Sequence, residues 1–238
     1  MSSIVSLVWK WKGPLDNRMA PIQNKLRVGR KSTSRVVVKN LLARKTRVRV
    51  LTGQSLVYVF FTRDHGAPAP TRRIEFSIEG AGASVLVFGF NVGRTGNTNT
   101  AIELIHTHRD TRSACWIQSV LAEDARSVVD GFIRINKDAA LSDAYFSHRS
   151  LLVSPRASAV TKPQLEILTN NVKAAHAAVV GRLDEDALFY VQSRGITMAE
   201  ARRLTIDSFL CESLVHLEDS AVQQKVLTRI RALTRSIL

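Results

Sequence analysis

The sequence predicts a mainly β protein that ends in a small helical unit, and two observations support this fold class. Strand-like runs recur roughly every 11 to 17 residues between about residues 26 and 179, separated by turn-forming sequences such as GQS, EGAGAS and GRTGNTN. After Gly181 the apolar period changes from two residues to about 3.6, the period of an α-helix. Short, regularly spaced runs suit a sandwich, a barrel or a β-solenoid, and periodicity alone leaves these three open.

Nine runs are expected to form strands, because they combine β-branched or aromatic residues with alternating polarity. In chain order they are RVVV (35–38), RVRVL (47–51), LVYVFF (56–61), RIEFSI (73–78), SVLVFGF (84–90), TAIELIHT (100–107), ACWIQSV (114–120), SVVDGFIRI (127–135) and QLEIL (164–168). No convincing helix pattern lies between them.

The first expected helix follows these runs directly. Asp184 stands at the position of an N-cap, and Glu185 and Asp186 fall in the first turn, where acidic side chains suit the helix dipole. Gly195 stands where a glycine would end the helix in the left-handed conformation. These three acids are therefore expected to be cap and dipole residues or contacts to a partner protein.

Two further helices are expected before the end of the chain. Thr197 and Glu200 form a capping box for the second, and a third is expected to begin near Ser220. The apolar stripes comprise Ile206, Leu210, Leu214 and Leu217 in the second helix, and Val222, Val226, Ile230, Leu233 and Ile237 in the third. The chain is thus expected to end in an amphipathic three-helix unit.

Composition indicates a folded protein outside the membrane. The chain has 238 residues, 45% of them apolar, and no run approaches the roughly 18 apolar residues of a transmembrane helix. The start, MSSIVSLVWKWKG, puts an apolar stretch ahead of its positive charges and lacks a small-residue cleavage site, so we expect no secretory signal and a cytoplasmic location. Cys115 and Cys211 form no CxxC pair and are expected to be two buried thiols.

The net charge of +14 lies entirely in the first third of the chain. Residues 1–73 hold 16 Lys and Arg against two acids, whereas residues 74–238 hold 18 of each. In RVRVL (47–51) the charges alternate with apolar residues, as on the solvated face of a strand. A surface for an acidic protein or for nucleic acid remains an alternative, because clustered basic residues release counterions from phosphates.

Residues 161–196 resemble the closing segment of the SufB/SufD family, scaffold proteins of iron–sulfur cluster assembly. The matching positions are Gln164 to Ile167, Val172, Lys173, His176, Gly181, Leu183 to Tyr190 and Ser193 to Ile196. The resemblance implies a right-handed parallel β-helix capped by about three C-terminal helices. It divides the chain into a lead-in segment (1–25), a β-helix core (26–180) and a helical domain (181–238), without the N-terminal helical domain of longer members.

The same resemblance implies partners. In this family the C-terminal helical domain binds the SufC ATPase, and SufB and SufD pair through their β-helices, so we expect a SufC-type ATPase and a SufB-like or identical second subunit. The residues expected on the docking surface are Asp184, Glu185, Leu188, Phe189, Tyr190, Arg194 and Gly195.

The metal-binding pattern of the family is mostly absent. Where SufD-type sequences read Val-Lys-Cys-Ser-His-Gly, this chain reads VKAAHA, with Ala174 in place of the cysteine. SufB-type sequences have a glutamate after the histidine, where this chain has Ala177, and the SufB cysteine one coil earlier falls on His148. His148 and His176 are therefore the candidate metal ligands, although two imidazoles do not replace the thiolates that a cluster needs.

Other chemistry is less well supported. His106 and His108 form an H-x-H pair that a strand would place on one face, and otherwise each histidine is expected to be hydrogen bonded within a strand. No P-loop, G-x-S-x-G or H-E-x-x-H motif occurs. We therefore expect a non-enzymatic, SufD-like assembly protein that holds no stable cofactor, with a transient iron–sulfur cluster or iron possible. The alternatives are a polyanion-binding solenoid, with nucleic acid as the less favoured ligand, and a histidine-based metal-binding protein.

Overall fold

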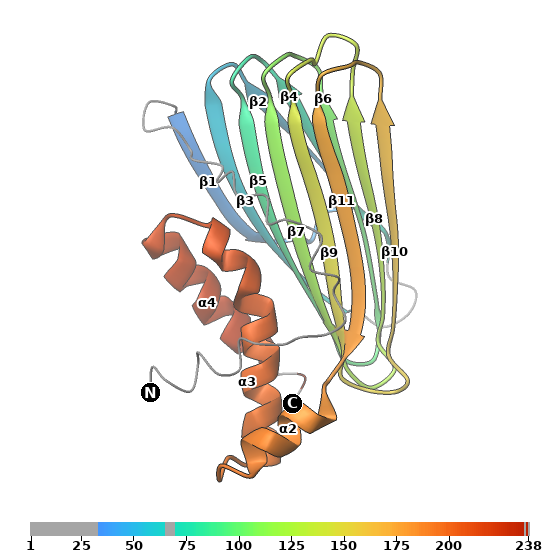
Figure 1. The fold of residues 1–238 in the computed structure, drawn as a ribbon, viewed down its shortest axis with the longest axis vertical. Helices are drawn as coiled ribbons and strands as arrows, with labels where there is room; N and C mark the ends of the chain where they lie inside the picture. The colour runs from blue at the N-terminus through green and yellow to red at the C-terminus, as the bar shows by residue number, and fades with distance from the viewer. Residues whose placement is uncertain (1–32, 65–69, 236, 238) are drawn as a thin grey trace.

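The computed structural model describes residues 33–64, 70–235 and 237, so the expected lead-in segment 1–25 lies outside the described residues. Its strands form two parallel sheets that face each other (Figure 1). The strands are β1 (Thr33–Asn40), β2 (Lys45–Leu51), β3 (Gln54–Arg63), β4 (Arg72–Glu79), β5 (Ser84–Gly93), β6 (Asn97–His106), β7 (Arg112–Leu121), β8 (Arg126–Ile135), β9 (Asp143–Leu152), β10 (Ser158–Ile167) and β11 (Lys173–Arg182).

The chain winds alternately through the two sheets, which makes a flattened β-helix. One sheet has the order β1-β3-β5-β7-β9-β11 and the other β10-β8-β6-β4-β2, and all neighbouring strands whose register is given are parallel. In Figure 1 the strands of the first sheet run downward in front, those of the second run upward behind, and successive coils advance to the right, so the coil is right-handed. The predicted right-handed parallel β-helix is confirmed.

One coil of this β-helix is two of the repeats seen in the sequence. Ser84 in β5 pairs with Arg112 in β7, 28 residues later, and Asp143 in β9 pairs with Lys173 in β11, 30 residues later. The sequence period of about half that length therefore marks single strands, which alternate between the sheets.

Two strands were absent from the nine expected runs, although all nine form strands. They are β9, DAYFSHRSLL, and β11, KAAHAAVVGR. Both combine several residues of low β propensity with few β-branched ones, so their local pattern is weak. Pairing with the neighbouring coil stabilises the strand conformation instead, because every residue of β11 pairs with a residue of β9.

Apolar side chains fill the space between the sheets. Residues of one parity in each strand point inward, such as Tyr58, Phe76 and Phe146, and they form one continuous buried cluster. The opposite face of the first sheet carries Val59, Phe88 and Phe90, which are buried under the C-terminal helices. The first sheet is therefore covered on both faces where the helices lie.

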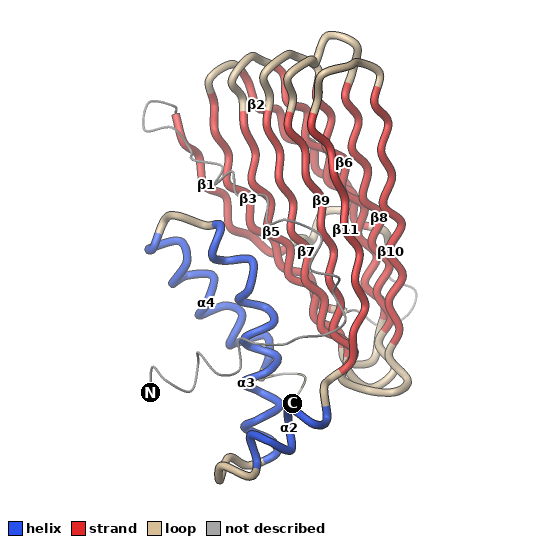
Figure 2. Tube along the Cα trace, viewed as in Figure 1, coloured by secondary structure: helices blue, strands red, loops and turns tan. Residues whose placement is uncertain are grey.

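The helices cap the chain as expected. In the described ranges they are α2 (Glu185–Gln192), α3 (Met198–Cys211) and α4 (Ser220–Thr234), with a 3₁₀ turn at Glu212–His216 (Figure 2). The Thr197 capping box and the Asp184 N-cap are both present, and Gly195 has a φ of +84°. None of the helices in the described ranges is long and apolar enough to cross a membrane.

The second expected apolar stripe spans two elements. Ile206 and Leu210 lie in α3 and Leu214 in the 3₁₀ turn, and all of them are buried with Leu217 against the first sheet. In α4, Val222, Val226 and Ile230 face the same cluster. The buried stripe residues were predicted correctly, but two helix ends differ, because α3 stops at Cys211 and α4 stops at Thr234, before Ile237.

Candidate functional site

His148 lies inside the β-helix, where it is fully buried. Its Nδ1 is 2.6 Å from the Thr161 hydroxyl, and its Nε2 is 2.8 Å from the Ser119 hydroxyl and 3.1 Å from the Ser150 hydroxyl. Burial lowers the pKa of His148 to about 3, so the imidazole is neutral near pH 7. Both ring nitrogens are thus engaged with hydroxyl groups.

His176 does not share a register position with His148. His176 in β11 pairs with Phe146, and His148 pairs with Ala178, so the two histidines are offset by two residues along adjacent strands. His176 is exposed, whereas His148 is enclosed. A metal ion shared by the pair would require His148 to give up its hydroxyl partners.

His106 and the two thiols are placed as structural groups. His106 ends β6 and is buried between the Thr111 and Ser113 hydroxyls, each 2.8 Å away, whereas His108 lies exposed in the following turn. The expectation that both share one face was wrong, because β6 ends between them. Burial raises the pKa of the Cys115 thiol, and it raises that of the half-buried Cys211 to about 11.

Metal-ligating side chains do not gather elsewhere in the described ranges, where no group of three or more His, Cys, Asp or Glu residues could hold a metal ion. Thiolate ligands for iron require deprotonated cysteine, and both thiols are shifted toward the protonated form.

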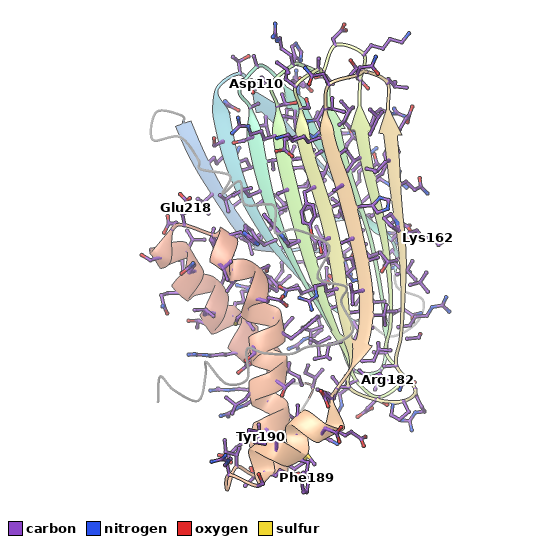
Figure 3. All side chains as sticks on the ribbon, viewed as in Figure 1. Asp110, Lys162, Arg182, Phe189, Tyr190 and Glu218 are labelled. Carbon is purple, nitrogen blue, oxygen red and sulfur yellow. The ribbon has the colours of Figure 1, made fainter. Side chains whose placement is uncertain are left out.

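The expected docking residues lie in and beside α2, and Figure 3 shows Phe189 and Tyr190 at the lower tip of the molecule. The Asp184 carboxylate accepts hydrogen bonds from the backbone amides of Asp186 and Ala187, at 3.0 and 3.1 Å. Glu185 is exposed in the first turn of α2. Asp184 thus fixes where α2 begins.

An aromatic pair projects from this helix. Phe189 is 73% exposed and Tyr190 is 48% exposed. The Arg194 guanidinium lies 5.3 Å from the centre of the Tyr190 ring and donates a hydrogen bond to its hydroxyl at 3.2 Å. Leu188, by contrast, is 4% exposed, so it anchors α2 to the protein and is not part of the accessible surface. Gly195 is exposed in the turn that follows.

The last coil presents a second apolar surface. β10 and β11 each stand at the end of a sheet, on the same end of the β-helix. Leu165 and Ile167 of β10 continue the inward-facing rows of Ile133 and Ile135, yet they are 37% and 43% exposed. Val180 of β11 is 48% exposed. We call Leu165, Ile167, Val180 and His176 the open end.

The basic first third is partly neutralised by acids of the next coil. Arg49 in β2 donates to the Glu79 carboxylate, with Nη2 at 2.5 Å, and Arg47 contacts Glu75 at 3.4 Å. These pairs lie on the outer face of the second sheet, as the solvated-strand interpretation of RVRVL predicts. They weaken the alternative of a polyanion surface there.

A row of polar residues inside the β-helix was missed from the sequence. Thr62, Asn91, Ser119 and Ser150 occupy matching register positions in four successive strands of the first sheet, and all are buried. Thr62 donates to Asn91, and the Asn91 amide donates to Ser119 at 3.2 Å. The signal was present, since these residues recur at 28 to 31 positions, but it requires the register to be known.

Comparison with known proteins identifies one family. Residues 46–209 match the model of the SUF system FeS cluster assembly SufBD core domain. The chain is 36% identical over 113 residues to the iron–sulfur cluster assembly protein SufD of Escherichia coli K12. This alignment covers 48% of this chain and 27% of that protein. It is 33% identical over 140 residues to SufD of Bacillus subtilis, covering 58% of this chain and 32% of that protein.

A cyanobacterial relative gives a similar result. An iron–sulfur cluster assembly SufBD family protein of Synechocystis is 32% identical over 133 residues, covering 56% of this chain and 29% of that protein. The chain therefore spans about a third or less of the length of these relatives.

Proposed function

The chain belongs to the SufB/SufD family of the SUF iron–sulfur cluster assembly system, and from this membership we propose that it is a non-enzymatic, SufD-like component of that machinery in the cytoplasm. Its task is to hold a SufC-type ATPase through its C-terminal helices and a second SufB-like or identical subunit through its β-helix. Three features of the described residues support these roles.

The exposed aromatic pair on α2 carries the docking proposal. Phe189 and Tyr190 expose 73% and 48% of their surfaces, although Leu188 beside them is buried. Large aromatic side chains with an adjacent arginine are typical anchors of protein interfaces, because they bury much area for little loss of conformational freedom. The neighbouring Asp184 and Leu188 hold α2 in place, so the pair is presented on a fixed helix. Glu185 and Gly195 complete the proposed surface.

The chemistry of the thiols and histidines supports a SufD-like role over a SufB-like one. Building a cluster needs thiolates, whereas this chain offers Ala174 in β11 and two cysteines whose pKa values are raised by burial. An iron–sulfur cluster is then cargo of the assembled complex, touching this subunit only transiently. Any direct ligand from this chain would be His176, because His148 is enclosed and bonded to hydroxyl groups.

The open end supports the second interface. The terminal strands β10 and β11 present backbone edges together with the apolar side chains of Leu165, Ile167 and Val180. An exposed strand edge with apolar neighbours pairs readily with another chain. A second SufB-like or identical subunit would extend both sheets and cover this surface.

One experiment tests the proposal as a whole. The protein is co-expressed with the SufC-type ATPase of the same cell, purified anaerobically through a tag on this chain, and the ATPase, iron and sulfide in the complex are measured. We expect stoichiometric ATPase with little iron or sulfide. Absence of the ATPase would refute the docking role, and stoichiometric iron and sulfide on this chain alone would refute the SufD-like assignment.

A further inference from the structure

A buried arginine lies inside the β-helix, and no acid of the described residues pairs with it. Arg72, the first residue of β4, is 4% exposed, and its Nε and Nη1 atoms make no hydrogen bond. Within the ranges that the structure describes, no carboxylate forms an ion pair with it. Its position on the inward face follows from the alternation of β4, where Ile74 and Phe76 on the same face are also buried.

Three hydroxyl groups on the two neighbouring strands of the same sheet are also unsatisfied. The Oγ1 atoms of Thr98 and Thr100 and the Oγ atom of Ser127 are buried and make no hydrogen bond. Thr100 in β6 pairs in register with Arg72, and Thr98 pairs with Ser127 in β8. All four side chains lie on the inward face near the start of three adjacent strands, and we refer to them as one cluster.

The chemistry of this cluster fits an anion better than water alone. A guanidinium group stays protonated at any physiological pH, so its charge cannot be removed by loss of a proton. Burial lowers the pKa of Arg72, and among the described residues no acid offsets this effect. An enclosed charge without a counter-charge is strongly unfavourable, and so is each buried hydroxyl that lacks a partner. The cluster offers five unpaired atoms, namely two N–H donors and three hydroxyls that can donate.

Buried apolar side chains border the cluster. Ile74 and Phe76 belong to the main core that adjoins the cluster along β4, and Leu121, Ala125 and Leu152 form a separate buried apolar cluster near the beginning of β8. One guanidinium neutralises one negative charge. We propose that Arg72, Thr98, Thr100 and Ser127 bind a small monovalent inorganic anion of halide size inside the β-helix, where it completes the packing of the early coils.

Anion-dependent stability tests this site. Bromide is titrated against gluconate at constant ionic strength while the thermal unfolding midpoint is measured. For the wild type we expect a rise that saturates with bromide, as mass action requires of a ligand that binds only the folded state. The Arg72→Met variant should show no saturable rise. Arg156→Met, which removes the same charge from an exposed turn, should respond as the wild type does. An equal response of Arg72→Met and the wild type, or none in either, would overturn the proposal.

A milder variant and a direct observation complete the test. Thr100→Val keeps the side-chain shape and removes one donor, so the bromide concentration for half the effect should rise roughly two- to tenfold. If Arg72→Met does not fold, the bromide response of Thr100→Val tests the anion site instead. In crystals grown in bromide, an anomalous scattering peak should contact the Arg72 guanidinium. Water at full occupancy in that position would exclude the anion.

Discussion

The tip of the Phe146 ring in β9 fills the space that a side chain would take at Gly131 in β8, a strand of the facing sheet. A Cβ atom added at Gly131 would lie 2.3 Å from Cζ and 2.4 Å from Cε1 of Phe146. Gly89 makes room for Phe60, its register partner on the neighbouring strand of the same sheet, and a Cβ there would lie 2.4 Å from the Phe60 Cζ. Large rings thus fit between the sheets because glycines make room for them.

We expect Gly131→Ala to destabilise the protein by about 1–3 kcal/mol, because the added methyl group would overpack a core that is already dense. Phe146→Leu alone should also destabilise, since it leaves a cavity. In the double variant the smaller leucine leaves space for the methyl group, so its cost should be less than the sum of the two single costs. Urea unfolding of the four proteins measures this coupling, and strictly additive costs would contradict the contact.

Stability should fall as the pH is lowered below about 6.5. His148 and His106 are buried, and their pKa values are lowered to about 3 and about 4. In the unfolded chain the pKa of each is about 6.5. Between these values the unfolded state binds more protons than the folded state, so the free energy of unfolding decreases with falling pH. The expected slope is about 1.4 kcal/mol per pH unit for each histidine, and it should vanish above pH 7.

Urea unfolding midpoints at pH 7.5, 6 and 5 measure this effect. His148→Gln should lose about half of the slope, since one of the two buried imidazoles is removed. The matched control is His176→Gln, which changes an exposed histidine and should keep the full slope. A wild-type stability that is flat between pH 5 and pH 7 would contradict the enclosed, neutral state of both histidines.

The sequence allowed the strands of high β propensity, the helix caps and the apolar stripes to be predicted, because each depends on a few neighbouring residues. β9 and β11 were missed because their residues favour a strand only weakly, and pairing with adjacent coils determines them. The polar residues inside the β-helix could not be predicted for the same reason, because their burial depends on strand register. In the sequence RRIEFS, Arg72 resembles a charged residue on the solvated face of a strand. Only the alternation of inward and outward residues along β4 shows that it points inward.

The candidate site was likewise predictable only in part. Asp184 and Gly195 were predictable from cap chemistry. Leu188 and Phe189 are adjacent apolar residues on one short helix, and the sequence gives no reason to bury the first and expose the second. Packing of α2 against α3 decides this, with Leu188 4% exposed and Phe189 73% exposed. The offset between His148 and His176 likewise follows from the register of β9 and β11.

Removing the exposed aromatic ring of α2 should weaken ATPase binding without unfolding the protein. We expect Phe189→Ala to reduce affinity for the SufC-type ATPase at least tenfold, the effect of losing an interface anchor. Arg194→Glu should act in the same direction, because it reverses a charge and removes the contact with Tyr190. Isothermal titration calorimetry measures affinity, and thermal unfolding checks the fold.

Two controls separate binding from folding. Val215→Ala shortens another exposed apolar residue, 61% exposed in the 3₁₀ turn, and should leave the affinity unchanged. Leu188→Ala should instead destabilise the protein by about 2–5 kcal/mol, since Leu188 is buried. Unchanged affinity in both Phe189→Ala and Arg194→Glu would remove α2 from the interface.

A charge placed at the open end should prevent pairing with a second subunit. Val180 is 48% exposed on the terminal strand β11, so Val180→Lys adds a charge without disturbing a filled core. In an interface the same lysine would be buried opposite apolar side chains, which is costly because the ammonium group loses its water. Light scattering across micromolar concentrations should show a dimer for the wild type and a monomer for the variant. Leu42→Lys provides the control, since Leu42 is 74% exposed in the turn between β1 and β2 at the opposite end of the β-helix, and it should leave the dimer intact. If Leu42→Lys dissociates the dimer and Val180→Lys does not, the subunits meet through the first coil.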